Sequence, residues 1–288
     1  VVTLVFFIQR ITGDPTALLL PETATQADIE AMRATLGLDR PLLAQYINFL
    51  GDMARFDLGR SFVQNASVEE IIVSRIPETL QLAAGALVVA LLIGLPLGLL
   101  MALTKGRFIS RWIMGIVLAC QSMPTFWSGI MMILVFGVWL RWLPSSGTGT
   151  LSHLIMPSIA LGLLSLATYA RITRSAVVDE MGKDYVRSAL ARGVGTKRLV
   201  TKHLMRNSLI PIISITALEL SQLLAGAVIV ETVFAWPGLG LLTVQSIAAR
   251  DFVVVQAVVL LGAFVTIFAN LAADILYSIV DPRVRLSV

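Results

Sequence analysis

The sequence predicts an all-α fold, that of a polytopic membrane protein. Of its 288 residues, 57% are hydrophobic and only 14% are charged, whereas a soluble domain carries about 25% charged residues. The mean hydropathy is +0.85. The charges are also unevenly placed, because the stretch from Arg171 to Arg206 alone contains twelve of them. The remainder cannot cover the surface of a soluble globule, and long uncharged stretches are left that suit a bilayer.

Five stretches are long and apolar enough to cross a membrane, which takes about 20 residues. They are residues 79–103, 112–140, 151–170, 209–230 and 252–280. Pro124 interrupts the second stretch, and we expect a kink there. The apolar residues 1–8 are too few for a span, so they are either an interfacial piece or the end of a helix whose beginning is absent. We expect the second, with 1–12 as the end of a truncated first helix. The sequence therefore predicts six transmembrane helices.

The basic residues predict the orientation of these helices. Of 22 Lys and Arg residues, 14 fall in segments 104–111, 171–208 and 281–288. Basic residues concentrate in cytoplasmic loops, so we expect these segments and both termini to be cytoplasmic. Nucleic-acid binding is disfavoured, because the basic residues have no stacking aromatic side chains among them.

Residues 13–77 then lie outside the membrane and predict a small amphipathic segment. Thr25 to Asp28 has the pattern of a helix start. Pro41 suits the start of a second helix, with Leu42, Ile47 and Leu50 apolar.

The inner stretch 171–208 predicts a short helix, a glycine turn and a second helix. The first helix is expected over Asp184–Arg192, and Gly193-Val194-Gly195 breaks it. Thr196 is expected to cap the second helix, which would run to Pro211. The apolar side of such a projection needs a partner, and its Arg and Lys residues would frame a docking surface. The alternative is an ordered basic loop that binds anionic lipid headgroups.

The residues of this loop also carry a family resemblance. The run Asp184-Tyr185-Val186-Arg187-Ser188-Ala189-Leu190-Ala191-Arg192-Gly193, with His203 and Arg206-Asn207 downstream, resembles the cytoplasmic EAA loop of ABC importer permeases. Further similar stretches are Gly13-Asp14-Pro15, Leu36 to Pro41, Asp57 to Ser61, Glu231 to Gly240, Arg250-Asp251 and Asp281-Pro282-Arg283. The general loop begins Glu-Ala-Ala where this chain has Arg187-Ser188-Ala189. The match is nearest to the dipeptide and oligopeptide branch, which includes nickel and glutathione importers.

The resemblance implies a type I ABC importer fold, with residues 78–288 as the permease transmembrane domain and 171–208 as its coupling loop. It implies half of a translocation pathway for di- or oligopeptides or a related small solute, in a bacterial or archaeal plasma membrane. The implied partners are a second homologous permease subunit, two cytoplasmic ABC ATPase subunits and an extracytoplasmic substrate-binding protein. The residues implied to couple to the ATPase are Asp184, Tyr185, Ala189, Arg192, Gly193 and His203.

Other candidates come from polar residues within or beside the spans. Glu219 and Asp274 are acids inside apolar stretches, where ionisable groups usually face a partner or a watery cavity. Residues that could line the translocation path are Glu219, Gln222, Ser122 and Pro124; the alternatives are helix packing and a simple kink. Glu231, Trp236 and Pro237 could form an outer gate or contact the binding protein, or Trp236 could anchor at the membrane interface.

Several absences argue against catalysis by this chain. No G-x-x-x-x-G-K-[ST], H-E-x-x-H or G-x-S-x-G motif occurs, so we expect no enzyme activity and place ATP hydrolysis on partner subunits. The single cysteine, Cys120, and the distant His153 and His203 predict no metal site and no cofactor. The rival interpretation is a self-sufficient ion-coupled secondary transporter or channel, with Glu219 or Asp274 as the ion site.

Overall fold

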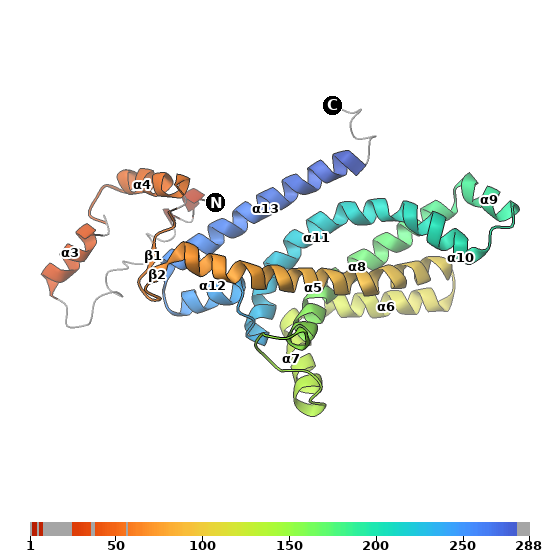
Figure 1. The fold of residues 1–288 in the computed structure, drawn as a ribbon, viewed down its shortest axis with the longest axis horizontal. Helices are drawn as coiled ribbons and strands as arrows, with labels where there is room; N and C mark the ends of the chain where they lie inside the picture. The colour runs from red at the N-terminus through yellow and green to blue at the C-terminus, as the bar shows by residue number, and fades with distance from the viewer. Residues whose placement is uncertain (1, 5, 8–24, 36–37, 56, 281–288) are drawn as a thin grey trace. The chain divides into compact units, whose positions relative to one another are not determined.

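The computed structural model describes residues 2–4, 6–7, 25–35, 38–55 and 57–280. Apart from one antiparallel strand pair, β1 (Arg60–Ser61) and β2 (Ala66–Ser67), the elements in this part of the chain are helices (Figure 1). They form two compact units, Val1–Pro77 with Gly238–Phe264 and Glu78–Pro237 with Val265–Val288. Each unit has an apolar core of its own. The predicted all-α fold is confirmed.

The larger unit contains most of the long apolar helices. In order, its elements are α5 (Val68–Leu103, from Glu78 onward), α6 (Phe108–Ser122), α7 (Thr125–Met132), the π-helical η1 (Ile133–Trp139), α8 (Leu151–Met181), α9 (Asp184–Ala191), α10 (Thr196–Arg198), the π-helical η2 (Leu199–Leu204), α11 (Met205–Phe234) and α13 (Phe252–Val280, from Val265 onward). Helix α8 packs against α6, α7 and α11.

Glycines bring α5 and α8 into close contact. A Cβ atom at Gly94 would lie 2.8 Å from Tyr169 Cβ, and one at Gly98 would lie 2.5 Å from the carbonyl oxygen of Ala170. Small residues at such spacing allow helix backbones to approach in a membrane, where van der Waals packing drives association. The short stretch Gly94 to Gly98 thereby fixes the contact between these two helices.

The membrane spans agree with the predicted stretches. Among the residues that the structure describes, three helices are long and apolar enough to cross a membrane, Val68–Leu103, Leu151–Met181 and Phe252–Ala272. Counting each bent helix pair as one span gives up to five in the described part of the chain, the pairs being Phe108–Ser122 with Thr125–Trp139 and Leu199–Thr216 with Leu218–Phe234. The remaining predicted span, the truncated first helix, includes residues 1–8. Of these the structure describes only 2–4 and 6–7, which are helical.

Two boundaries differ from the sequence prediction. At Pro124 we expected a kink, but α6 and α7 meet at an angle of 98°. Met123 adopts an extended backbone (φ −73°, ψ 130°), as the residue before a proline prefers, so the helix ends there and starts again. Residues 68–77, expected in the external segment, already belong to α5.

The smaller unit contains α3 (Gln26–Thr35), α4 (Leu42–Ala54), the strand pair, the start of α5, α12 (Leu239–Ala248) and the start of α13 (Phe252–Val280). The predicted helix start at 25–28 is confirmed, because the Thr25 N–H donates to Asp28 Oδ2 (2.9 Å) and the Asp28 N–H donates to Thr25 Oγ1 (3.3 Å). Helix α4 begins directly after Pro41. The buried Ser61 hydroxyl donates to Asp251 Oδ2 (2.5 Å), which ties the strand pair to the turn before α13.

Candidate functional site

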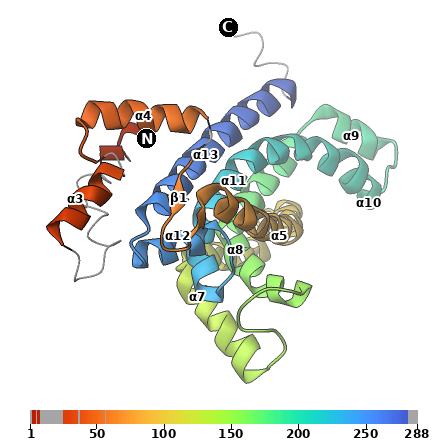
Figure 2. The same cartoon turned by 60° about the vertical axis from the view of Figure 1, so that its left-hand side comes forward.

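Helix α9 and the turn after it form a projection between the end of α8 and the start of α10 (Figure 2). Gly193 has φ +74°. Its N–H donates to Leu190 O (2.9 Å), and the Val194 N–H donates to Ala189 O (3.1 Å). This pair of bonds is the Schellman arrangement, in which a glycine in the left-handed conformation follows the helix. Gly193 therefore ends α9 with a defined cap, in which its N–H and that of Val194 are both bonded.

The apolar side of the projection packs on its own chain, not on a free surface. Val186 and Ala189 are buried with Leu199, Val200 and Leu204 of η2, Val177 of α8 and Ala102 of α5. The expectation that this side needs a partner was wrong, because the membrane helices of the same chain cover it. Ala189 is buried in this packing and is therefore not exposed for contact with a partner.

A polar cluster joins the projection to both neighbouring helices. Tyr185 of α9 donates its hydroxyl to Glu180 Oε2 at 2.6 Å, and Asn207 of α11 donates to Glu180 Oε2 (3.4 Å) and to the Tyr185 oxygen (3.2 Å). Glu180 is buried near the end of α8 and also pairs with Lys183. Burial, with the hydrogen bond to Glu180, raises the pKa of Tyr185 above its usual value.

Sequence reasoning missed Glu180. A signal was available, because Asp179 and Glu180 both fall in the last turn of α8, where the helix dipole disfavours negative charge. An acid kept in such a place usually has compensating partners. For Glu180 these are Lys183, Tyr185 and Asn207.

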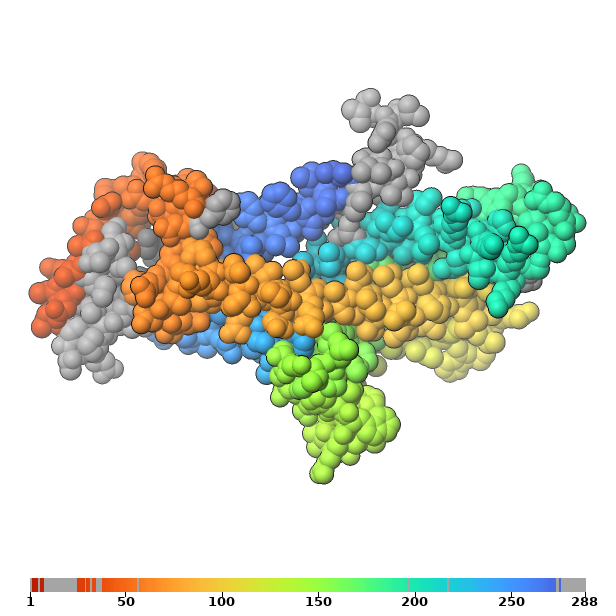
Figure 3. Space-filling view, in the orientation of Figure 1, coloured from red at the N-terminus to blue at the C-terminus, as the bar shows by residue number. Residues whose placement is uncertain are grey.

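The outward side of the projection is mainly basic. Asp184 and Arg187 are exposed and lie 3.7 Å apart. Leu190 is 53% exposed, and the exposed Arg192, Lys197 and Arg198 follow it. In the space-filling view, α9 and α10 form the tip of the larger unit (Figure 3). The exposed surface of the projection thus combines Leu190 with several basic side chains.

Two details of the loop also differ from expectation or extend it. The second helix begins with Thr196 in α10 and does not end at Pro211, because α10, η2 and α11 follow one another without a break in sequence. His203 lies in η2, half-buried, with its ring 6.5 Å from the ring of Tyr185. Tyr185 and His203, predicted together from the sequence, are therefore neighbours.

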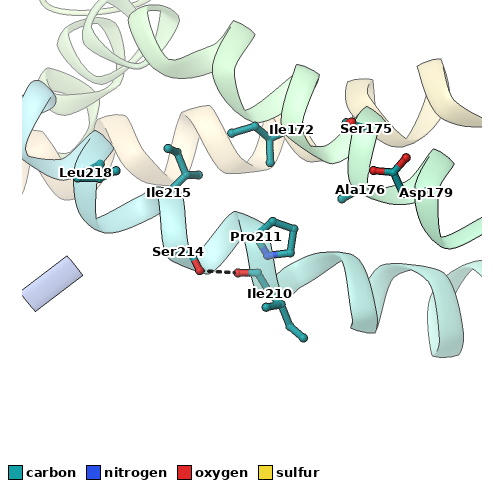
Figure 4. A pocket seen from close by; sticks show the side chains of 9 residues that line it. All are labelled: Ile172, Ser175, Ala176, Asp179, Ile210, Pro211, Ser214, Ile215 and Leu218. Atoms are coloured by element: carbon teal, nitrogen blue, oxygen red, sulfur yellow. Dashed lines mark hydrogen bonds between the residues drawn. The ribbon is translucent and has the colours of Figure 1, made fainter. Parts of the chain in front are cut away.

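A pocket of about 490 Å³ opens between α8 and α11 (Figure 4). This volume lies within the range of about 300–1,000 Å³ that small-molecule sites occupy. Its polar groups include Ser175 and the Asp179 carboxylate on α8 and Ser214 on α11, and the rest is mostly apolar. The full lining is Ile172, Ser175, Ala176, Asp179, Ile210, Pro211, Ser214, Ile215 and Leu218.

None of the predicted path residues lines this pocket. Glu219 follows Leu218 in the chain but is buried. Gln222 is exposed and lies one turn beyond Leu218 on the same side of α11. Ser122 and Pro124 lie at the break between α6 and α7, where the Ser122 hydroxyl donates to Leu118 O (2.8 Å). The side chain of Asp274 lies outside the described residues.

The predicted outer residues are mostly buried. Glu231 accepts a hydrogen bond from the Thr79 hydroxyl (2.7 Å), and the Trp236 Nε1–H donates to Glu78 O (2.9 Å). Glu231 and Trp236 are fully buried, and Pro237 is half-buried. Trp236 therefore belongs to the core and does not anchor at the membrane surface. A direct contact of Glu231 or Trp236 with another protein would require these side chains to become exposed.

In the described part of the chain, no three or more His, Cys, Asp and Glu side chains gather in a way that could hold a metal ion. The features with functional geometry there are the projection, its polar cluster and the pocket between α8 and α11.

Comparison with known sequences identifies the family. Residues 94–286 match the binding-protein-dependent transport system inner membrane component, and residues 1–83 match the N-terminal region of such components. The di/tripeptide transport system permease protein DppB of Pseudomonas aeruginosa is 38% identical, with 99% of this chain and 94% of the relative covered. The glutathione transport system permease protein GsiC of Escherichia coli K12 is 39% identical, with 97% and 91% covered.

Solved structures show the same fold. An inward-facing structure of the methionine ABC transporter MetNI aligns with a TM-score of 0.62 at 22% identity, covering 73% of this chain and 96% of that chain. An amino acid ABC transporter aligns with a TM-score of 0.56 at 16% identity, covering 73% and 94%. These likenesses concern the fold, and the relatives support the permease role over a self-sufficient transporter. The chain belongs to the binding-protein-dependent inner membrane components, the membrane permease subunits of ABC importers.

Proposed function

We propose that this permease carries short peptides or a related small solute such as glutathione. The support is the similarity to DppB and GsiC over nearly the whole chain. The pocket between α8 and α11 has a volume compatible with such a solute, and its mixed apolar and hydroxyl lining fits one with both apolar and polar groups.

In this proposal the chain works with four other subunits. A second homologous permease completes the pathway, two ATPase subunits bind inside, and a binding protein delivers the solute outside. The basic segments 104–111, 171–208 and 281–288 support a cytoplasmic location of the projection and of both termini.

The observation that carries the coupling role is the attachment of α9 to two membrane helices at once. Glu180 of α8 and Asn207 of α11 both bind Tyr185. A push on the outward side of α9 is therefore passed to α8 and α11 together, and these two helices line the pocket. Rigid transmission of this kind would alternate the access of the pocket as the ATPase closes and opens.

The docking surface is tested by charge reversal. Arg198 is exposed on the projection and is replaced by glutamate (Arg198→Glu). The matched control is Arg107→Glu, at an exposed residue of the other basic inner loop. Both permeases and the affinity-tagged ATPase are purified together, and the retained permease is quantified. We expect Arg198→Glu to lower retention several-fold and Arg107→Glu to leave it unchanged. Equal retention of both variants would remove this surface from the docking role.

A separate substitution tests whether Glu219, which is buried and does not line the pocket, takes part in the path. Glu219→Gln keeps the size of the side chain and removes its charge, so assembly with the ATPase should persist while solute uptake changes. Ser208→Ala, a buried polar residue elsewhere on α11, is the control. Uptake by Glu219→Gln equal to the native rate would show that Glu219 serves packing alone.

A further inference from the structure

Helix α4, in the segment 13–77, has an aliphatic side that nothing in the described part of the chain covers. Leu43, Ile47 and Leu50 are 71%, 60% and 39% exposed. Their spacing of four and three residues places them on one side of the helix. Asn48 and Asp52, also exposed, lie on another side, so the exposed surface of α4 is divided into an aliphatic and a polar part.

The remaining side of α4 is held by aromatic side chains against residues 2–7. The ring of Phe6 lies 5.2 Å from that of Tyr46 and 5.5 Å from that of Phe49. The hydroxyls of Thr3 and Tyr46 are 2.8 Å apart. The start of the chain and α4 belong to the same smaller unit, and the two cartoon views show them side by side (Figures 1 and 2). The position of α4 is thus fixed relative to residues 2–7.

The chemistry of residues 2–7 indicates what covers the aliphatic side. They belong to the apolar stretch expected to be the outer end of a transmembrane helix, and Leu4 and Phe7 are 62% and 44% exposed. A helix fixed beside such an end lies at the level of the lipid headgroups. Tyrosine and other aromatic residues favour this level, and an amphipathic helix there buries its apolar side by roughly 5–10 Å.

We propose that α4 is an interfacial helix, with Leu43, Ile47 and Leu50 inserted in the outer leaflet and Asn48 and Asp52 facing water. Helix α4 itself contains no Lys or Arg, so anionic lipids are not required and a zwitterionic phosphatidylcholine surface suffices. The outer location rests on the orientation in the proposed function, whereas the lipid contact rests on the geometry of α4.

The experiment uses single cysteines in the assembled transporter, with both permeases and the ATPases in phosphatidylcholine nanodiscs. Cys120, the one cysteine of the sequence, is first replaced by serine. Ile47→Cys and the matched control Asn48→Cys carry a nitroxide, and collision rates with oxygen and with a water-soluble nickel chelate are measured. Both native side chains are exposed, so neither change disturbs packing within the chain.

The quantity compared is the ratio of the collision rate with oxygen to the collision rate with the nickel chelate. We expect this ratio to be several-fold higher at position 47 than at position 48, with or without the binding protein. Equal ratios at both positions would overturn the proposal in favour of a water-facing helix. Low collision rates with both reagents at position 47 would overturn it in favour of a protein partner, the second permease if they occur at once and the binding protein if they require its addition.

The orientation is tested separately, by labelling Asn48→Cys in intact cells with a membrane-impermeant maleimide. Labelling is expected. Its absence, together with a lipid signature at position 47, would contradict the outer leaflet and the proposed orientation while leaving the lipid contact itself established.

Discussion

At the scale of single residues, three α-helices of the described chain end with a residue in the left-handed conformation. These are Gly193 after α9, Ala235 after α11 and Arg250 after α12, with φ of +74°, +50° and +56°. After each of them, the next N–H bonds back to a carbonyl five residues earlier. Only the first uses glycine, for which this conformation is free of Cβ strain.

Replacing Gly193 by alanine tests that assignment. A Cβ at Gly193 would meet no atom within 4 Å, so the cost is conformational alone, about 1–2 kcal/mol. We expect a lower thermal midpoint for the purified permease and weaker retention of the ATPase. Gly195→Ala, also in open space but without positive φ, is the control. Equal behaviour of the two variants would contradict the role given to Gly193.

The opposite change is expected at Ala235. Ala235→Gly relieves the left-handed strain at the end of α11 and should stabilise the protein by about 1 kcal/mol. Ala249→Gly, at the end of α12 with φ −82°, relieves nothing and should be neutral or destabilising. Thermal unfolding of both variants and of the native protein is measured in the same detergent. A midpoint for Ala235→Gly below that of the native protein would refute the argument.

At the scale of elements, the position of α9 depends on its polar cluster. Tyr185→Phe removes the hydrogen bond to Glu180, and bonds to a charged group typically contribute about 1.5–3 kcal/mol when buried. The effect is smaller here because Tyr185 is half-buried. We expect ATP hydrolysis to continue while the amount of solute imported per ATP falls. The rates of hydrolysis and import are measured in the same proteoliposomes.

The matched control is Ser188→Ala on the same helix. Ser188 is exposed, and exposed substitutions of this kind usually change stability by about 0.5 kcal/mol or less. Import per ATP should stay at the native value. A loss as large as that of Tyr185→Phe would mean that the cluster has no special part in transmission.

The elements were largely predictable from the sequence, because spans follow from uncharged stretches and the α9 turn follows from Gly193. The break at Pro124 was predicted as a milder kink, since sequence alone does not give the angle at which a helix restarts. Which side of α9 is covered was not predictable. Its partners, such as Val177 and Ala102, lie on distant segments, and only tertiary packing brings them together.

The candidate site was only partly predictable, because some of its contacts also join residues that are distant in the sequence. Tyr185, His203 and Gly193 are implied by the family resemblance of the loop, whereas the partners of Glu180 are identified only when α8, α9 and α11 are packed together. The pocket likewise joins residues of two helices that are separated by the whole loop. Glu231 and Trp236 are conspicuous in the sequence, but their burial is decided by contacts with Thr79 and Glu78.

At the scale of the whole molecule, one path connects the inner surface to the pocket. The projection presents basic residues and Leu190, its cap fixes the end of α9, and Tyr185 ties it to α8 and α11. These same two helices line the pocket. In the proposed mechanism, a movement at α9 becomes a change of access between α8 and α11, and ATP hydrolysis takes place on the partner subunits.

The accessibility of Ser175, exposed on the α8 wall of the pocket, tests this coupling most directly. Ser175→Cys is introduced after Cys120→Ser in the assembled transporter, and the rate of maleimide labelling from the cytoplasmic side is compared without nucleotide and in the ATP-trapped state. The account predicts labelling several-fold slower in the trapped state, with Arg107→Cys in the other inner loop unaffected. The same rate at position 175 in both states would contradict the coupling of α9 to the pocket.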